Sequence, residues 1–385
     1  MMLNTRPRFE TLDGLRGVAA LLVVIYHITE GYASGPLTHV PNHGYLAVDF
    51  FFLLSGYVVG YAYDHRIATM GWKNFAKRRL IRLHPMIVFG TVLGMLLFYF
   101  SDGHPSFKDL SATPWWLVLA VGVWCSTLIP VPMALDIRGW CDFNPLNGAT
   151  WSLVWEYIGN VLYVVFLRHL STRLLMLLTS LAALLTLGLC FDIDLFGVLS
   201  ARAAAAYTVV GGWNLQPDQL TIGLTRLLYP FMMGLLLSRF GEKVHLRGSF
   251  PVCSLLLLAL LCMPRVGGSQ IAHFWMNGLY EAVCILILFP IILLMGVGSR
   301  NRATSTHRLC SFMGRISYPL YLVHLPIVFV HMSWAAAHPQ AATSVHVMAG
   351  LCTLVISIAV AYAALRLYDE PLRQHLTQYF EKKKK

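Results

Sequence analysis

Long apolar segments recur along the whole chain and are separated by short polar connectors. Eleven of these segments have, or nearly have, the length that a helix needs to cross a membrane. They are residues 14–30, 46–63, 83–101, 114–135, 151–167, 174–191, 219–238, 250–264, 277–297, 317–335 and 345–366. The pattern predicts an all-α fold, a polytopic bundle in which each span satisfies its own backbone hydrogen bonds.

Composition supports a membrane protein and excludes several other classes. The 385 residues are 57% apolar and only 12% charged, and the mean hydropathy is +0.62. These values exclude a disordered chain, a coiled coil and an ordinary cytosolic enzyme. The net charge of +11 does not come from a soluble basic domain, so we expect no nucleic-acid partner. The eight cysteines are scattered without a C-x-x-C pair, and we expect neither a metal site nor a disulfide framework.

The distribution of Lys and Arg orients the chain, because cytoplasmic connectors carry an excess of these residues. If both termini are cytoplasmic and 114–135 makes no net crossing, most of the 29 basic residues lie inside. If 114–135 crosses, the basic connectors 168–173, 239–249 and 298–316 face outward instead. We therefore predict ten spans, with 114–135 re-entrant or buried. Residues 1–385 are expected to form one membrane-embedded domain, with 371–385 as a basic cytoplasmic tail.

Four ionisable residues interrupt the predicted spans: His27, Asp49, Glu156 and Arg226. A helical rise of about 1.5 Å per residue places all four in the outer half of the membrane. Charges in a membrane are costly and mark functional sites by default. Structural roles are the alternative: His27 packs as a hydrogen-bonded residue, Asp49 caps its helix, and Glu156 with Arg226 forms a buried ion pair.

The predicted inner face carries a different pattern. Arg79 and Arg82 are three residues apart, so on a helix they share one face and suit a phosphate-bearing ligand. The positive-inside rule accounts for them equally well. Tyr321 and His324 lie in the predicted tenth span, where His324 either lines a cavity or packs in the core, and Tyr321 is either a site residue or an interface aromatic.

Six short motifs occur in a fixed order along the chain. They are Arg16 and His27 with ten residues between them, V-D-F-F-F-L-L-S-G at 48–56 containing Asp49, R-x-x-R at Arg79 and Arg82, W-S-L-V-W-E from Trp151 and Ser152 to Glu156, Arg226 before Phe231 and Gly234, and S-Y-P-L-Y-L-V-H at 317–324 containing Tyr321 and His324. Together these motifs resemble the acyltransferase-3 family of integral membrane acyltransferases. The resemblance covers residues 9–370 and is to stand-alone members without a fused extracytoplasmic hydrolase-like domain.

The resemblance implies a membrane-bound O-acyltransferase in the bacterial cytoplasmic (inner) membrane. The donor would be acyl-CoA, by default acetyl-CoA, on the cytoplasmic side, and no metal is implied. The acceptor would be a hydroxyl of a glycan, as in polysaccharide modification, or of another small molecule, and an extracytoplasmic acyl-accepting partner is conceivable. A carrier that moves an acyl group or lipid-linked glycan without forming the ester is the alternative. No inverted repeat is evident, which argues against that carrier.

The matching residues then receive expected roles. His27 would be the general base, oriented by Asp49 or Glu156. Arg79 and Arg82 would hold the CoA phosphates. Arg16 would do the same or polarise the thioester carbonyl. Arg226 would meet a carboxylate or the acceptor. The residues expected to bind substrate or support the site are Trp151, Ser152, Tyr321 and His324.

One feature of this assignment leaves the transfer route open. Arg16 and His27 are eleven positions apart, which is about 16 Å along a helix, so they cannot touch the same atom. Either an extended pantetheine arm bridges that gap, or His27 is itself acylated and relays the group outward.

Overall fold

The computed structural model describes residues 9–382 apart from Pro36 and residues 196, 200–201, 203–204, 242–248 and 300–303. All regular structure in these residues is helical, and nine of the helical segments are long and apolar enough to cross a membrane. The long or apolar helices are α1 (Glu10–Glu30), α2 (Ala47–Tyr63), α4 (Trp72–Leu97), α5 (Trp115–Cys125), α6 (Trp151–Val165), α7 (Thr172–Cys190), α8 (Pro217–Phe240), α9 (Ser249–Leu261), α10 (Phe274–Val283), α11 (Phe289–Gly298), α12 (Thr304–Ala337) and α13 (Thr343–Ala364). The prediction of an all-α membrane bundle is confirmed.

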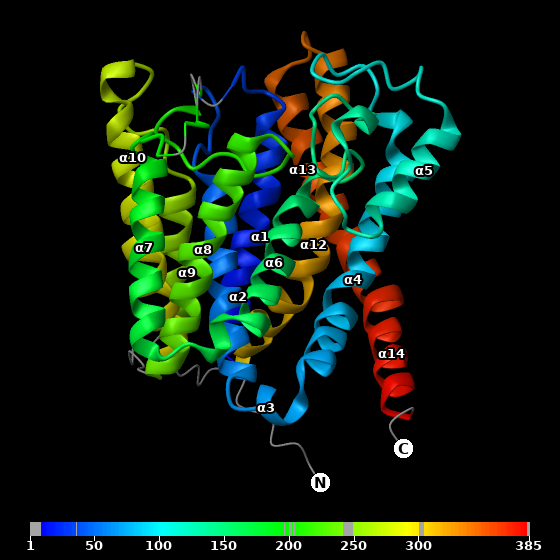
Figure 1. Ribbon diagram of the computed structural model, residues 1–385. Coiled ribbons are helices and arrows are strands. Elements are labelled where there is room, and N and C mark those ends of the chain that lie inside the picture. Colours follow the sequence, from blue (N-terminus) through cyan, green and yellow to red (C-terminus); the bar gives the residue numbers. More distant parts are fainter. Residues whose placement is uncertain are drawn as a thin grey trace.

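The helices run up and down through one bundle (Figure 1). A π-helical turn, Cys284–Leu288, joins α10 to α11 into one span, and a second, Leu365–Asp369, joins α13 to α14 (Glu370–Lys382). The short helix α3 (Ile67–Met70) lies at the end of the bundle where α1 begins and α14 ends (Figure 1). We call this end the terminal face and the other end the opposite face.

Small residues allow the central helices to approach one another closely. Gly56 on α2 faces the backbone of Phe231 on α8, and Gly234 on α8 faces the backbone of Leu53 on α2. A side chain at either glycine would meet that backbone, so the two helices could not pack this tightly. The contact fixes the level of Asp49 on α2 relative to Arg226 on α8.

The shortest predicted span, 250–264, is a helix of only 13 residues, α9. Its first turn places the Phe250 ring beside Gly14, near the start of α1. Beyond its last turn, the carbonyl of Met263 accepts a hydrogen bond from His43 Nδ1 at 2.7 Å, in the connector from α1 to α2. Because α9 links the two ends of the bundle, it makes the tenth crossing that the sequence predicts.

The segment 114–135 does not cross. Its helix α5 has 11 residues and is about 16 Å long, whereas the apolar layer is about 30 Å thick. The chain on either side of it returns to the opposite face, where Lys108 N donates to Arg138 O at 2.8 Å. In Figure 1, α5 lies in the half of the bundle nearer the opposite face. The prediction of a re-entrant or buried helix is confirmed.

The connector 136–150 inserts into the bundle before α6 begins. Asn147 Nδ2 donates to Leu322 O on α12 at 2.8 Å, and the carbonyl of Leu146 rests against Gly94 on α4. The Arg138 side chain is buried, donating to Pro145 O at 2.7 Å, with its guanidinium 4.0 Å from the Phe329 ring centroid. Since α6 starts inside the bundle, its residues lie deeper than a helix that starts at the membrane surface.

Two regions of the terminal face are more helical than predicted. α4 begins at Trp72 rather than at residue 83, so the basic connector before it is already helix. The predicted tail 371–385 is helical as far as Lys382, because α14 continues α13. α14 packs against α4, with the Lys77 ammonium 5.2 Å from the centroid of the Phe380 ring. The segment predicted as a basic tail is therefore a packed helix up to Lys382.

Candidate active site

A cavity of about 1600 Å³ occupies the half of the bundle nearer the terminal face. Its walls come from α1, α2, α4, α6, α12 and α14. Arg16 on α1 and the R-x-x-R pair of α4 line it, together with Ser152 and Tyr321 at its inner end. The helix through the basic connector brings Arg79 and Arg82 to the same cavity, as their spacing predicts.

Basic side chains outnumber acidic ones in this cavity. Eight basic residues line it: Arg16, Arg66, Lys77, Arg78, Arg79, Arg82, Arg315 and Arg373. Four acidic residues line it: Asp13, Glu156, Asp369 and Glu370. Each acid has an arginine partner, at 3.6 Å for Asp13 and Arg16 and at 2.6 Å for Glu370 and Arg315. The surplus of positive charge favours a ligand that carries several negative charges.

Arg82 is the clearest site for such a ligand. It makes no hydrogen bond or ion pair with any residue that the structure describes, and its side chain is exposed to the cavity. Its electrostatic neighbours include the guanidiniums of Arg16, Arg79 and Arg373. Several guanidiniums that converge without a carboxylate for each of them form the kind of group that binds phosphate.

Glu156 lies in the wall of this cavity and not beside His27. Its Oε1 atom accepts from Arg79 Nη2 at 2.5 Å and from Ser55 Oγ at 2.9 Å. The prediction that Glu156 orients His27 is therefore wrong, and so is its predicted pairing with Arg226. The cause is the inserted connector before α6, which shifts Glu156 toward the terminal face. Sequence reasoning missed Ser55, although it lies within the motif at 48–56.

Ser152 Oγ and Tyr321 OH, which both line the cavity, share a hydrogen bond at 2.7 Å. Beyond it the Tyr321 ring centroid lies 5.8 Å from that of His324, and the His324 ring lies 5.4 Å from His27. His324 is fully buried, with Nδ1 3.2 Å from Leu320 O. Its Nε2 has no hydrogen-bond partner among the described residues. Tyr321, His324 and His27 thus form a file that leads away from the cavity.

His27 contacts a carboxylate on its own helix. Its Nδ1 atom lies 2.8 Å from Glu30 Oε2, three residues further along the last turn of α1. The His27 side chain retains 24% of its exposed area, so it is reachable by a ligand. Sequence reasoning missed Glu30, although the spacing of three residues on one helix was a usable signal.

Asp49 and Arg226 form a buried ion pair with each other. Arg226 Nη2 donates to Asp49 Oδ2 at 2.7 Å, and both side chains keep only 1% of their exposed area. Arg226 also donates to Tyr45 O at 2.8 Å and lies 5.2 Å from the Trp151 ring centroid. Neither charge lines the cavity, and no contact with His27 is formed. The prediction that Asp49 orients His27 is wrong, and Trp151 contacts this pair.

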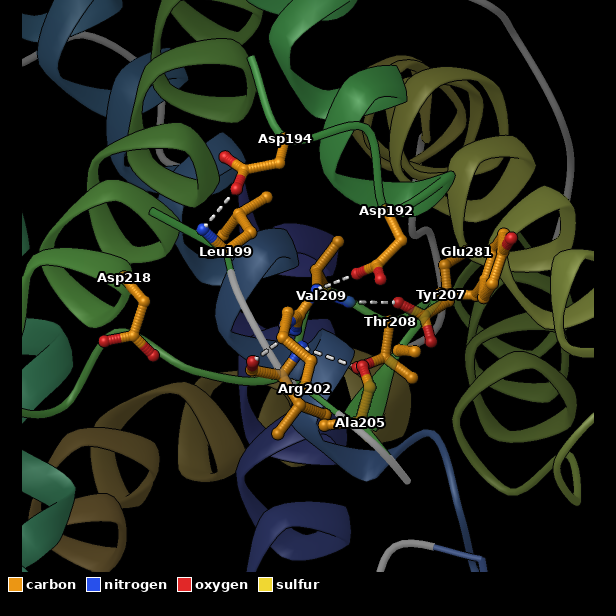
Figure 2. Close-up of polar contacts among 12 residues, drawn as sticks. Asp192, Asp194, Leu199, Arg202, Ala205, Tyr207, Thr208, Val209, Asp218 and Glu281 are labelled. Atoms are coloured by element: carbon orange, nitrogen blue, oxygen red, sulfur yellow. Dashed lines mark hydrogen bonds and ion pairs between the residues drawn. The ribbon is translucent and has the colours of Figure 1, made fainter. Parts of the chain in front are cut away.

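A second saturated network lies beneath the opposite face, around Glu281 of α10. Glu281 is fully buried and accepts from Val209 N at 2.7 Å, from Asn277 Nδ2 at 2.6 Å and from Tyr45 OH. Figure 2 shows this carboxylate beside the connector that follows α7, where Arg202 donates to Asp192 Oδ1 at 3.2 Å. Each charge drawn in contact has a partner within the protein, so this network is suited to holding the connector in place rather than to binding a ligand.

Comparison with known proteins identifies the family. A family described as an acyltransferase domain, acyltransferase-3, matches residues 9–366. The chain therefore belongs to the acyltransferase-3 family and is an integral membrane acyltransferase. The expectation drawn from the six motifs is confirmed.

The relatives are bacterial proteins. "Protein 2 in picA locus" of Rhizobium radiobacter is 34% identical over 163 residues, which are 40% of this chain and 81% of that protein. A Staphylococcus aureus protein named "Putative O-acetyltransferase" is 24% identical over 94% of this chain and 57% of its own length. The Bacillus subtilis "Putative peptidoglycan O-acetyltransferase YrhL" is 24% identical over 82% of this chain and 48% of its length. This chain spans about half the length of these two O-acetyltransferases, and no solved structure matches it.

Proposed function

We propose that the protein takes an acyl group, by default acetyl, from acyl-CoA in the basic cavity and transfers it to a hydroxyl at the opposite face. The observation that carries this proposal is the file of Tyr321, His324 and His27, which leads from the cavity toward Glu30. The acceptor is a glycan or another small hydroxyl-bearing molecule. The names of the O-acetyltransferase relatives support an oxygen acceptor.

The charge pattern supports a cytoplasmic donor. Most basic residues of the connectors fall on the terminal face, which is the cytoplasmic one by the positive-inside rule. The cavity reached from that face has a volume above the usual range for small ligands, about 300–1000 Å³. Arg16 and Arg82 would bind the phosphates of CoA, whereas Arg79, already paired with Glu156, would support the wall. The membrane would be the bacterial cytoplasmic membrane.

His27 is suited to act as the general base. When Nδ1–H donates to Glu30, the lone pair of Nε2 is left to accept a proton, and the carboxylate stabilises the imidazolium that forms. The acceptor oxygen would attack the thioester carbonyl as His27 takes its proton. The carbon–sulfur bond would then break, and the CoA thiolate would leave and receive that proton.

Two routes connect the cavity with His27. In the first, opening of the hydrogen bond between Ser152 and Tyr321 admits the pantetheine arm as far as His27. In the second, a histidine is acylated by the donor and passes the group to the acceptor. His324 belongs to this second route, because its buried Nε2 has no hydrogen-bond partner in the described part of the chain and its ring lies against that of His27.

Purified protein in nanodiscs with radiolabelled acetyl-CoA tests the proposal. We expect His27→Ala to lower CoA release and acceptor labelling at least 100-fold, the usual contribution of a general base. His338→Ala, which removes an exposed histidine at the end of α12, should retain full activity. Label on the wild-type protein would select the relay. Full acceptor modification by His27→Ala would refute both routes. Movement of the labelled acyl group across the membrane without formation of an ester would indicate a carrier.

A further inference from the structure

The helix α14 extends one wall of the donor cavity beyond the region shared with the family. The family match ends at residue 366, whereas α14 covers Glu370–Lys382. Six of its side chains line the cavity: Glu370, Arg373, Gln374, Thr377, Gln378 and Phe380. Positions 373 and 377, and positions 374 and 378, are each one turn apart, so one polar stripe of α14 faces the cavity.

This stripe lies at the mouth of the cavity. α14 runs beside the basic end of α4 toward the terminal face (Figure 1). Tyr321 lines the same cavity and lies beside His324, which leads away from it. The Lys77 ammonium over the Phe380 ring holds the end of α14 against α4. A ligand whose reactive end reaches Tyr321 therefore has its other end against α14.

Charged groups in the stripe are arranged to receive a ligand. Arg373 donates to Asp369 Oδ2 at 2.9 Å and is an electrostatic neighbour of the unpaired Arg82. Asp369 keeps 1% of its exposed area, and its second oxygen, Oδ1, has no hydrogen-bond partner among the described residues. The buried carboxylate of Asp369 thus holds the Arg373 side chain in the wall of the cavity.

We propose that α14 binds the adenosine 3′,5′-diphosphate end of the donor, an inference that rests on the proposed function. Arg373 and Arg82 together hold the 3′-phosphate, because two guanidiniums from facing helices can each give bidentate hydrogen bonds to it. The side-chain amides of Gln374 and Gln378 carry both a donor and an acceptor, which is the pattern that pairs with an adenine edge.

The test compares binding of CoA with binding of 3′-dephospho-CoA to the full chain in nanodiscs. We expect wild type to bind CoA at least about tenfold more tightly than 3′-dephospho-CoA. Arg373→Gln should abolish that preference while leaving the affinity for 3′-dephospho-CoA nearly unchanged. Arg366→Gln is the matched control, since Arg366 is an exposed arginine on the same continuous helix and does not line the cavity; it should keep the wild-type preference.

A second variant guards against local misfolding. Arg373→Gln leaves the buried Asp369 without its partner, whereas Asp369→Asn/Arg373→Gln removes both charges. The double variant should also lose the preference for the 3′-phosphate. Equal weakening of both ligands, or an unchanged preference in both variants, would overturn the role of α14. Failure of wild type to bind either ligand would instead refute the proposed donor, and this inference with it.

Discussion

The two ends of this bundle use charged residues of the same types in opposite ways. Beneath the opposite face, Asp49 and Arg226 satisfy each other, and Glu281 receives three hydrogen bonds. In the cavity near the terminal face, Arg82 has no partner among the described residues. Buried charges that are fully matched hold helices together, whereas charges without a partner are available to a ligand. Substitutions in the two regions should therefore separate stability from donor binding.

The largest effect should come from breaking the pair of Asp49 and Arg226. Asp49→Ala leaves the Arg226 guanidinium buried and uncompensated, which costs about 3–5 kcal/mol of the free energy of unfolding. We expect a large fall in the thermal unfolding midpoint in nanodiscs, measured by tryptophan fluorescence. Arg78→Ala, which removes an exposed arginine of the cavity, is the control and should leave the midpoint unchanged. An unchanged midpoint in Asp49→Ala would contradict the structural role of the pair.

A smaller loss of stability should follow Glu281→Gln. Both carboxylate oxygens of Glu281 accept hydrogen bonds, and the amide group of Gln would place N–H atoms against one of these donors. The expected cost is about 1–3 kcal/mol. The thermal midpoint measures this loss, and CoA affinity of the folded fraction serves as the control because it should not change. Weakened CoA binding at full stability would instead show that the network around Glu281 contributes to CoA binding.

The reverse pattern is expected for Arg82→Gln in the cavity. Removing a guanidinium that has no hydrogen-bond or ion-pair partner among the described residues should leave the free energy of unfolding within about 0.5 kcal/mol of wild type. CoA affinity should fall about tenfold, the effect of one charge-assisted contact with phosphate. Titration of CoA into wild type and variant measures this change. A destabilised variant with normal CoA affinity would assign Arg82 to the structural group instead.

The smallest expected effect is a pH dependence of the opposite face. Burial lowers the pKa of His43, which lies between Met263 O and Asn277 Oδ1. The unfolded chain therefore binds a proton near pH 6.5 that the folded chain rejects, and stability falls as pH falls through that value. Between pH 7 and pH 6 the loss is at most about 0.7 kcal/mol. In His43→Gln the thermal midpoint should change less with pH than in wild type. An identical pH dependence would exclude His43 as its cause.

Local sequence features predicted most of the helices and much of the basic cavity. The spacing of Arg79 and Arg82 places both on one helix face, and the charge of the connectors predicts that 114–135 does not cross. The spacing of Glu30 three residues beyond His27 was equally local. The motifs identified the family because six of them occur in order over nearly the whole chain.

Long-range contacts explain what the sequence did not predict. The depth of Glu156 depends on the inserted connector, and Asn147 anchors that connector to Leu322, 175 residues away. Depth alone also could not choose between Asp49 and Glu156 as the partner of Arg226. The polar composition of 371–385 indicated a tail. The sequence did not predict the packing of α14 against α4, because that contact is visible only in three dimensions.

The central claim is that donor and acceptor meet from opposite faces at His27. Protein reconstituted in one orientation in proteoliposomes tests it, with labelled acetyl-CoA at the terminal face and a hydroxyl acceptor in either compartment. We predict labelling of the acceptor at the opposite face, and its loss in His27→Ala. Labelling only when donor and acceptor share the terminal face, or labelling that survives His27→Ala, would contradict this account.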